Sequence, residues 1–312
     1  MPKYKAHIIV LNYEGRDLLA KYLPSIVEAV QASSHPCRVT VLDNCSTDGS
    51  LEFVRKNFPT VLTYRPSENR VLCSFNELAS QIDDDIVILL NNDLKVEPGF
   101  VDPLVKIFED HEDALFASAY SDRAMAKLHW GILAADIHFR GCASILDKPS
   151  YTVNTGMGAF HRKRFLALGG YDPLFLPGRY EDLDLCFRGW QQGWKGYYVP
   201  QSKVHHEGGT SFNKFYSEKE NEKLVFRNSL FFMLKNISSP LLLLNFYGGL
   251  LCRLAFYTLT GKFHLWSAFT EAFAKRSRID AAKRILPAKK MKDRTILRTI
   301  NDSIRSLLQG AA

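Results

Sequence analysis

Two polar clusters in the 312-residue chain have side chains suited to catalysis. The first, Asn91-Asn92-Asp93, directly follows the apolar run 85–90. A carboxylate at the end of a buried strand can meet a divalent cation and a diphosphate. An aspartate in this position also commonly caps the next turn, so the cluster alone leaves a metal site and a structural cap both open.

The second cluster, Glu181-Asp182, opens a helix predicted over 180–193 and follows the segment Leu176-Pro177-Gly178-Arg179. A carboxylate there is a candidate general base for a hydroxyl group. Acids in a first helical turn also stabilise the helix dipole, and we assign that structural role to Asp184. His206 lies in the predicted loop 205–209 and offers an imidazole to a metal or a phosphate, although a single loop histidine is usually only a surface residue.

Alternating strands and helices are predicted to position these side chains. Apolar spacing predicts strands over 6–11, 37–43, 61–64 and 85–90, and helices over 16–30, 51–58 and 76–82; a later strand is predicted over 152–160. This alternation indicates an α/β fold with a parallel, doubly wound sheet, whose ligands bind at the carboxyl ends of the strands. Asn12, Asp43 and Asp93 are all expected at that edge.

Composition indicates a globular protein of a reducing compartment. The chain is 46 % hydrophobic, and its six cysteines show neither a C-x-x-C pair nor a zinc-ligand spacing. The apolar start of the chain is interrupted at Asn12 before a signal-peptide core could form, so a cytoplasmic location is expected.

The last quarter of the chain differs in charge from the rest. Residues 225–312 contain 15 Lys and Arg against 4 Asp and Glu, whereas residues 1–224 contain 25 against 29. The apolar stretch 240–252 is shorter than the ~20 residues that span a bilayer, and Arg253 interrupts it. Two predicted helical faces follow, formed by Leu265, Trp266, Phe269 and Phe273 and by Ile296, Ile300, Ile304 and Leu307. With the basic residues of 275–294 they favour an interfacial anchor on an anionic membrane; the alternative is a tail that packs on the rest of the protein or on a partner.

The ordered motifs together resemble the family-two inverting glycosyltransferases with a GT-A fold, especially the branch that contains rhamnosyltransferases. The resembling segments are HIIVLNYEGRDLLAKYLPSI, VTVLDNCSTDGS, ILLNNDLKVEPGFVDPL, NTGMGAFHRKRFLALGGYDPLFLPGRYEDLDLCFRGWQQGWKGYYVP and KVHHEGGTS, which extend over about residues 6–211. The resemblance implies a Rossmann-like, mostly parallel sheet flanked by helices, followed here by a C-terminal α-helical appendage.

The resemblance also assigns roles to individual residues. Asp182 matches the catalytic base and Glu181 supports the acceptor site. Asp93 matches the metal-binding acid of a D-x-D-like element, written N-N-D here, and His206 is the candidate second ligand for Mn²⁺ or Mg²⁺. The nucleotide-sugar donor would contact Asn12, Asp43, Asn44, Asn69, Arg70, Asn92 and Arg179. The segment 69–76 lacks the glycines that the family often has there, so the pocket near Asn69 and Arg70 is expected to differ, and Arg70 either pairs with phosphate or is a solvated surface residue.

The sequence thus predicts an inverting hexosyltransferase that moves a sugar, from dTDP-rhamnose or a UDP-sugar, to a saccharide or lipid-linked glycan in cell-surface polysaccharide synthesis. We expect a catalytic domain over 1–224, with a nucleotide-sugar half to about 120 and an acceptor half over 121–224, and a basic, membrane-associating tail over 225–312 at the inner face of the cell membrane. The alternatives are a sugar-phosphate nucleotidyltransferase and an inactive nucleotide- or glycan-binding relative. Nucleic acid is not an expected partner, and self-association is left open.

Overall fold

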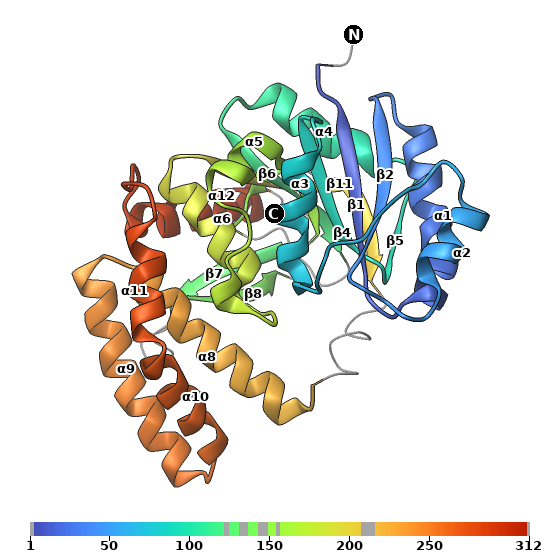
Figure 1. Ribbon diagram of the computed structural model, residues 1–312. Coiled ribbons are helices and arrows are strands. Elements are labelled where there is room, and N and C mark those ends of the chain that lie inside the picture. The colour runs from blue at the N-terminus through green and yellow to red at the C-terminus, as the bar shows by residue number, and fades with distance from the viewer. Residues whose placement is uncertain are drawn as a thin grey trace.

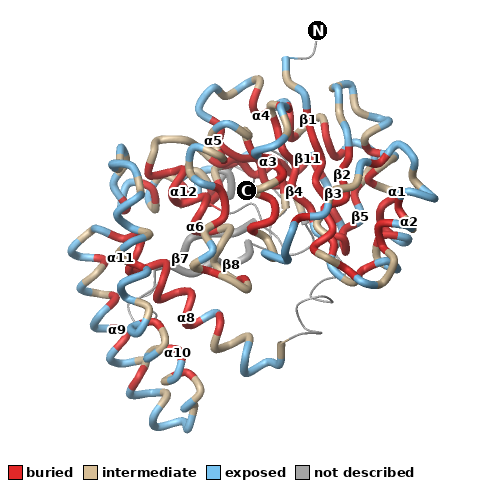
Figure 2. Tube along the Cα trace, viewed as in Figure 1, coloured by how far each residue is buried: buried red, intermediate tan, exposed pale blue. Residues whose placement is uncertain are grey.

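The computed structural model describes residues 3–121, 125–130, 137–142, 149–153, 157–206 and 216–310. Within these ranges the backbone alone is described at 121, 125–130, 137–142, 206 and 307–310. Helices cover both faces of a central sheet, and further helices extend from one side of this body (Figure 1). Buried residues concentrate in the sheet and in the helix faces that touch it (Figure 2).

The N-terminal half of the sheet is parallel, as predicted. Strand β1 (Ala6–Asn12) pairs in parallel with β2 (Cys37–Asp43) and with β4 (Ile86–Asn91), and β2 pairs in parallel with β3 (Leu62–Tyr64). Strands β1 and β4 are buried over nearly their whole length, which explains their continuous apolar runs. Because the strands run in one direction, Asn12, Asp43 and Asn91 end at the same edge of the sheet.

The other half of the sheet is mixed, so the expected doubly wound parallel sheet was wrong beyond β4. Strand β10 (Gly158–His161) is antiparallel to both β4 and β6 (Ala114–Ser121), while β11 (Lys195–His206) is parallel to β6 and antiparallel to β5 (Leu94–Val96). We predicted a strand over 152–160, and the observed strand β10 begins at Gly158. Residues 154–156 lie outside the described part of the chain. A short β9 (Ser150–Tyr151) pairs with β11, and β7 (Met125–Trp130) forms a separate hairpin with β8 (Ile137–Cys142).

Two apolar cores form on the two faces of the sheet. On one face lie α1 (Arg16–Ala32), α2 (Ser50–Asn57) and α4 (Val101–Asp110). On the other lie α3 (Ser74–Gln81), α5 (Arg162–Ala167) and α6 (Glu181–Gln191), with the short helices η1 (Val71–Cys73) and η2 (Pro173–Phe175). The C-terminal helices are α8 (Glu218–Asn236), α9 (Pro240–Leu259), α10 (Phe263–Ala274), α11 (Arg276–Arg284) and α12 (Asp293–Gly310). The second core continues into these C-terminal helices without a break.

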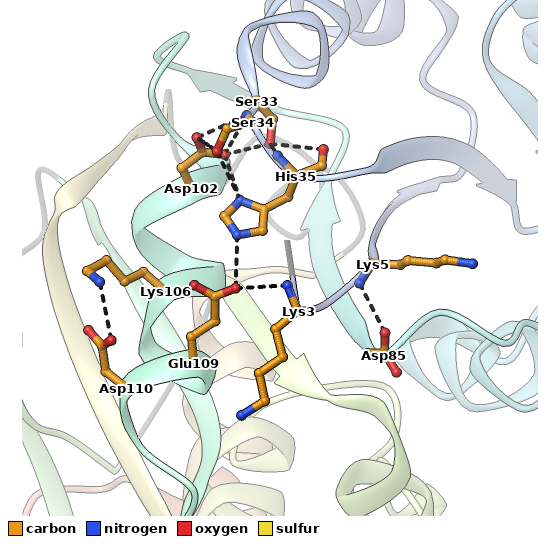
Figure 3. A network of polar contacts seen from close by, with 10 residues as sticks. All are labelled: Lys3, Lys5, Ser33, Ser34, His35, Asp85, Asp102, Lys106, Glu109 and Asp110. Atoms are coloured by element: carbon orange, nitrogen blue, oxygen red, sulfur yellow. Dashed lines mark hydrogen bonds and ion pairs between the residues drawn. The ribbon is translucent and has the colours of Figure 1, made fainter. Parts of the chain in front are cut away.

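A polar network fastens the edge of the sheet opposite to Asn12 and Asp43 (Figure 3). His35 lies between Asp102 and Glu109 of α4, with Nδ1 3.2 Å from Asp102 Oδ1 and Nε2 3.4 Å from Glu109 Oε1. Burial opposes the ionisation of Asp102, but hydrogen bonds from Ser33, Ser34 and His35 outweigh it and lower its pKa to about 2. The side chains of Ser33, Ser34, His35, Asp102 and Glu109 all have hydrogen-bond partners within the network. This indicates that the network serves to join the end of α1 to α4.

A buried ion network joins α8 to α6. The Asp184 carboxylate is fully buried and accepts from Lys235 Nζ at 2.8 Å, from Arg188 Nε at 2.8 Å and from Asn236 Nδ2 at 2.7 Å. Burial opposes its charge, but Arg188 and Lys235 lower its pKa below the usual value. The structural role expected for Asp184 therefore comes from these ion pairs, and α8 spans the position near residue 224 where we expected the catalytic domain to end.

We expect Lys235→Met to lower the free energy of unfolding by about 3–5 kcal/mol, because it removes one of the two cations that pair with a buried carboxylate. Lys223→Met is the matched control on the same helix; its ammonium is partly exposed and 3.7 Å from Glu271, so the loss should stay below about 1 kcal/mol. Denaturant unfolding measures both. Because the folded-state pKa of Asp184 is lowered, the difference between wild type and Lys235→Met should be full near neutral pH and shrink as the pH falls below ~4. Equal losses in the two variants would contradict this account.

Helix α9 is longer than the sequence pattern suggested. It runs for 20 residues, past Arg253, and among the described residues it is the one helix long and apolar enough to cross a membrane by length and composition. The expectation that the apolar stretch ends at 252 was therefore wrong. The guanidinium of Arg253 lies over the Phe226 ring, 5.5 Å from its centroid, so the charge is accommodated by α8 and does not end the helix.

The last helix has the apolar face that its residue spacing predicted, but this face packs on the protein itself and not on a membrane. Ile296, Ile300 and Ile304 are fully buried, and α12 packs against β9 and β7. In α10, Leu265 is buried while Phe273 is exposed, so the face that packs differs from the predicted aromatic one. Of the two amphipathic stretches expected on a membrane, the described part of the final one is thus a packing face of the protein body.

Candidate active site

Three polar side chains at the carboxyl edge of the sheet form one buried cluster. Asn12 Nδ2 donates to Asp43 Oδ1 at 2.7 Å, and Asn92 Nδ2 donates to Asn12 Oδ1 at 2.7 Å. Each residue is at least nine-tenths buried. The structure therefore brings together the side chains predicted at the ends of β1, β2 and β4.

Two residues that the sequence analysis did not assign to the site hold this cluster. Ser46 donates from Oγ to Asp43 Oδ1 at 2.6 Å and from its backbone N to Oδ2 at 3.0 Å. At Gly15 a Cβ atom would lie 2.1 Å from Asn92 Nδ2 and 2.6 Å from Asn12 Oδ1, so only glycine leaves room for the two amides. The sequence did contain a signal for the role of Gly15. A glycine just after a strand, as here three residues after Asn12, often marks a place where other groups approach the backbone closely.

Asp93 is buried directly beyond β4, next to this cluster. In the antiparallel pair of β5 and β11, His206 is the register partner of Leu94, so the backbones of Asp93 and His206 are neighbours. The His206 side chain and residues 207–215 lie outside what the structure describes. Among the described residues no group of three or more His, Cys, Asp or Glu could hold a metal. One carboxylate and one imidazole, completed by diphosphate and water oxygens, nevertheless suit Mg²⁺ or Mn²⁺.

A cavity of about 600 Å³ lies between the η1–α3 segment and η2. Its lining consists of Glu68, Asn69, Arg70, Cys73, Asn76, Glu77, Pro173 and Leu176. Arg70 is more than half exposed and pairs with Glu68 at 2.6 Å, and Asn69 Oδ1 accepts from the Val71 backbone at 2.8 Å. The sequence left Arg70 as either a phosphate partner or a solvated surface residue. In the structure it is a solvated arginine paired with Glu68, and it borders the cavity.

Helix α3 links the edge cluster, through Asn44, to this cavity and then to α6. The Asn44 backbone N donates to the Asn12 carbonyl oxygen at 2.8 Å. Asn44 Oδ1 accepts from Ser74 Oγ at 2.5 Å, at the start of α3. Two residues on, Asn76 pairs with the Tyr171 backbone, donating from Nδ2 at 2.8 Å and accepting at Oδ1 at 2.9 Å. Tyr171 is buried, and its hydroxyl hydrogen-bonds to the Asp182 carboxylate. The sequence analysis missed Asn76 and Tyr171, because neither stands at a strand end.

Glu181 and Asp182 occupy the first turn of α6 in unequal environments. Burial raises the pKa of both carboxyls, and the charge of Asp182 raises that of Glu181 further. The hydrogen bond from Tyr171 opposes the rise in pKa at Asp182, and a backbone hydrogen bond and the charge of Arg179 oppose it at Glu181. Glu181 Oε2 is buried, and no hydrogen-bond partner for it lies in the described part of the chain. Asp182 is thus the member of the pair that ionises first, while Glu181 retains the proton.

The backbone immediately before this pair is in an unusual conformation. Arg179 and Tyr180 have φ angles of 78° and 70°, in the left-handed region, which costs non-glycine residues ~1–2 kcal/mol each. Arg179 Nε donates to Asn221 Oδ1 of α8 at 2.8 Å, and its charge lowers the pKa of Glu181. Arg179 is therefore close to the carboxyl pair.

Comparisons with known proteins find a matching family and a relative in sequence. The family model of Glycosyl transferase family 2 matches residues 7–166. The N-acetylglucosaminyl-diphospho-decaprenol L-rhamnosyltransferase of Mycobacterium tuberculosis is 24 % identical over 236 residues, which cover 64 % of this chain and 75 % of that protein.

Solved structures share the fold at low sequence identity. The 1–349 fragment of S. aureus TarS in complex with UDP-GlcNAc superposes with a TM-score of 0.56 at 16 % identity, covering 97 % of this chain and 92 % of that one. The mannosyltransferase PcManGT from Pyrobaculum calidifontis, in complex with GDP-Man and Mn²⁺, gives 0.52 at 16 % identity, covering 99 % and 87 %. GalNAc-T7 with UDP, GalNAc and Mn²⁺ gives 0.54 at 16 % identity; the match covers 74 % of this chain but only 48 % of GalNAc-T7.

The mixed sheet, its flanking helices and the polar edge define a glycosyltransferase of the GT-A fold, which confirms the fold class predicted from the sequence. The chain belongs to Glycosyl transferase family 2. The predicted enzyme class, a glycosyltransferase, is confirmed with it.

Proposed function

We propose that the protein is an inverting glycosyltransferase that moves a sugar from dTDP-rhamnose or a UDP-sugar to a saccharide or lipid-linked glycan in cell-surface polysaccharide synthesis. The main observation in support is the carboxyl pair of α6, in which Tyr171 favours the charged form of Asp182 while Glu181 stays protonated. When one of two neighbouring acids is charged and the other is protonated, the first can act as a base and the second as a hydrogen-bond donor.

In the proposed reaction Asp182 accepts the proton of the acceptor hydroxyl as that oxygen attacks the anomeric carbon. Glu181, with an Oε2 atom that has no partner among the described residues, would hydrogen-bond the acceptor. The bond from the anomeric carbon to the diphosphate breaks in the same step, so the configuration inverts. Arg179, beside the pair, would stabilise negative charge that develops on the reacting groups.

The nucleotide part of the donor is assigned to the edge cluster of Asn12, Asp43 and Asn92 together with the adjacent Asn44, and the cavity at Asn69 and Arg70 extends this site. Asp93 and His206 would hold Mn²⁺ or Mg²⁺. When bound, such an ion offsets the charge of a departing nucleoside diphosphate. The Mn²⁺ complexes of PcManGT and GalNAc-T7 support a divalent metal ion as the cofactor.

The choice of donor and acceptor class is supported by the mycobacterial relative, whose name specifies a rhamnosyl donor and a lipid-diphosphate-linked N-acetylglucosamine acceptor. A panel of nucleotide sugars, each tested for thermal stabilisation and slow hydrolysis with and without Mn²⁺, tests the donor. Stabilisation and hydrolysis of dTDP-rhamnose or one UDP-sugar support the proposal. Pyrophosphorolysis of the donor to a sugar phosphate would instead favour a nucleotidyltransferase, and binding without any turnover an inactive relative.

A peripheral position on the inner membrane face is the second part of the proposal, and α9 supports it. This helix exposes a row of leucines, with Leu244 69 %, Leu251 70 % and Leu259 86 % accessible. Figure 2 shows exposed segments alternating with buried and intermediate ones along the same helix. Arg276 of the basic helix α11 hydrogen-bonds to Tyr247 of α9, so positive charge flanks this apolar row. An apolar face beside cations matches the acyl chains and headgroups of an anionic leaflet.

We expect the double variant Leu244→Ser/Leu251→Ser to lose at least ten-fold in affinity for vesicles of mixed phosphatidylcholine and phosphatidylglycerol, measured by co-sedimentation. Leu62→Ser on the edge strand β3, at a site 50 % exposed, is the matched control and should bind as wild type. Wild-type binding should weaken with salt and on pure phosphatidylcholine. Unchanged binding of the double variant, or a wild-type dimer that the variant converts to a monomer without any vesicle binding, would contradict the membrane assignment of α9.

A further inference from the structure

Two neighbouring side chains of α8 bond to most of the loop that leads into the carboxyl pair. Asn228 Nδ2 lies 2.9 Å from the Phe175 carbonyl oxygen and 2.8 Å from those of Gly178 and Arg179. Arg227 Nη2 donates to the Leu176 carbonyl oxygen at 2.8 Å. Four carbonyl oxygens between residues 175 and 179 therefore lie within hydrogen-bond distance of donors on α8, and three of them share the two N–H bonds of the Asn228 amide.

The donors are themselves held in place. Arg227 Nε donates to Asn228 Oδ1 at 2.9 Å, which fixes the amide with its NH₂ group toward the loop. Arg227 Nη1 also donates to Glu271 Oε1 of α10 at 2.9 Å. Both residues are at least nine-tenths buried, so water does not replace these bonds.

The loop needs such support because its own residues do not favour its path. Arg179 and Tyr180 are left-handed without being glycine, and the Tyr180 side chain, at the N-cap position of α6, makes no capping hydrogen bond. Helix α8 also contacts the chain before this loop and at its end: Lys235 Nζ donates to Asp172 Oδ2 at 2.6 Å, and Asn221 Oδ1 accepts from Arg179 Nε at 2.8 Å. We propose that Arg227 and Asn228 are positioning residues, which hold residues 175–180 so that Glu181 and Asp182 face the acceptor.

This inference rests on the proposed role of Asp182 as the base. Helix α8 is the first of the C-terminal helices. If it positions Glu181 and Asp182, the alignment of the catalytic pair depends on the C-terminal helices. A merely structural clamp would, in contrast, alter the amount of folded protein and leave the turnover of each folded molecule unchanged.

The test compares Asn228→Ala with Asn236→Ala, a buried asparagine of the same helix that bonds to Asp184 and not to the loop. Asn228→Ala should lower kcat at least ten-fold, with acceptor KM and the Kd of UDP with Mn²⁺ within about two-fold of wild type. Asn236→Ala should keep kcat within about three-fold at a similar drop in Tm. The donor is dTDP-rhamnose or the nucleotide sugar that wild type turns over in the panel. Hydrogen exchange of peptides over 172–182 should rise in Asn228→Ala only.

If Asn228→Ala does not fold, Asn221→Ala serves as a milder variant, because Asn221 lies at the partly exposed start of α8. We expect Asn221→Ala to lower kcat three-fold or more. Equal kcat losses in the Asn228 and Asn236 variants, or unchanged exchange over 172–182, would overturn the inference. Asp182→Asn is measured in parallel: if it too is fully active, the proposed base is wrong, whereas an inactive Asp182→Asn beside a fully active Asn228→Ala refutes the positioning role alone.

Discussion

Replacing Asp182 with asparagine is expected to lower kcat by about 10²–10⁴-fold, the usual contribution of a general base, while nucleotide binding persists. The amide keeps the size of the side chain and its contact with Tyr171 but cannot accept a proton. Steady-state transfer measures kcat, and calorimetry with UDP and Mn²⁺ measures binding. Glu181→Gln is the matched control, because it removes the neighbouring acid and leaves the base; its loss should be below ten-fold.

The pH dependence provides a second signature of the same residue. Burial raises the pKa of Asp182, so the active, deprotonated form requires a higher pH than an ordinary aspartate with a pKa near ~4. Wild-type kcat should therefore rise with pH along an acidic limb displaced upward from that value. The residual activity of Asp182→Asn should lack this limb. Near-normal turnover, or an unaltered limb in the variant, would remove Asp182 from the mechanism.

Replacing Asp93 with alanine is expected to have the second largest effect. If Asp93 and His206 hold the divalent ion, the variant loses the only carboxylate of the pair, and phosphate charge is poorly compensated. We expect calorimetry to show UDP binding at least ten-fold weaker in the presence of Mn²⁺, and little changed in its absence.

The control for this variant is Asp83→Ala, which removes an acid that precedes β4 at the opposite edge and is 91 % exposed. It should bind UDP as wild type does, with the same dependence on Mn²⁺. The same UDP affinity and Mn²⁺ dependence in Asp93→Ala would make Asp93 a structural cap at the end of β4, the alternative that the sequence left open.

The edge cluster was predictable because it depends on local pattern and on one topological rule. Each of β1, β2 and β4 is a short apolar run ended by a polar residue, and parallel strands end at one edge. Asn12, Asp43 and Asn92 therefore had to meet. Tyr171 was not predictable in this way, since its contact with Asp182 requires the chain to fold back between α5 and α6, which no spacing encodes.

The errors in the C-terminal helices have a common cause. The pattern of Ile296, Ile300 and Ile304 correctly indicates an apolar helical face, but a face alone does not say whether lipid or β9 covers it. The end of α9 was misjudged because Arg253 was taken as an interruption, whereas its partner, Phe226, is on another helix. The antiparallel insertion of β10 between β4 and β6 is likewise a long-range pairing.

The most direct test of the central claim is the anomeric configuration of the product, determined by NMR after transfer from dTDP-rhamnose or the active UDP-sugar to a short-chain lipid-diphosphate-linked N-acetylglucosamine. A single displacement with Asp182 as base predicts a product whose anomeric configuration is opposite to that of the donor, formed by wild type and not by Asp182→Asn. Retention of the donor configuration, or equal product formation by the variant, would contradict the account.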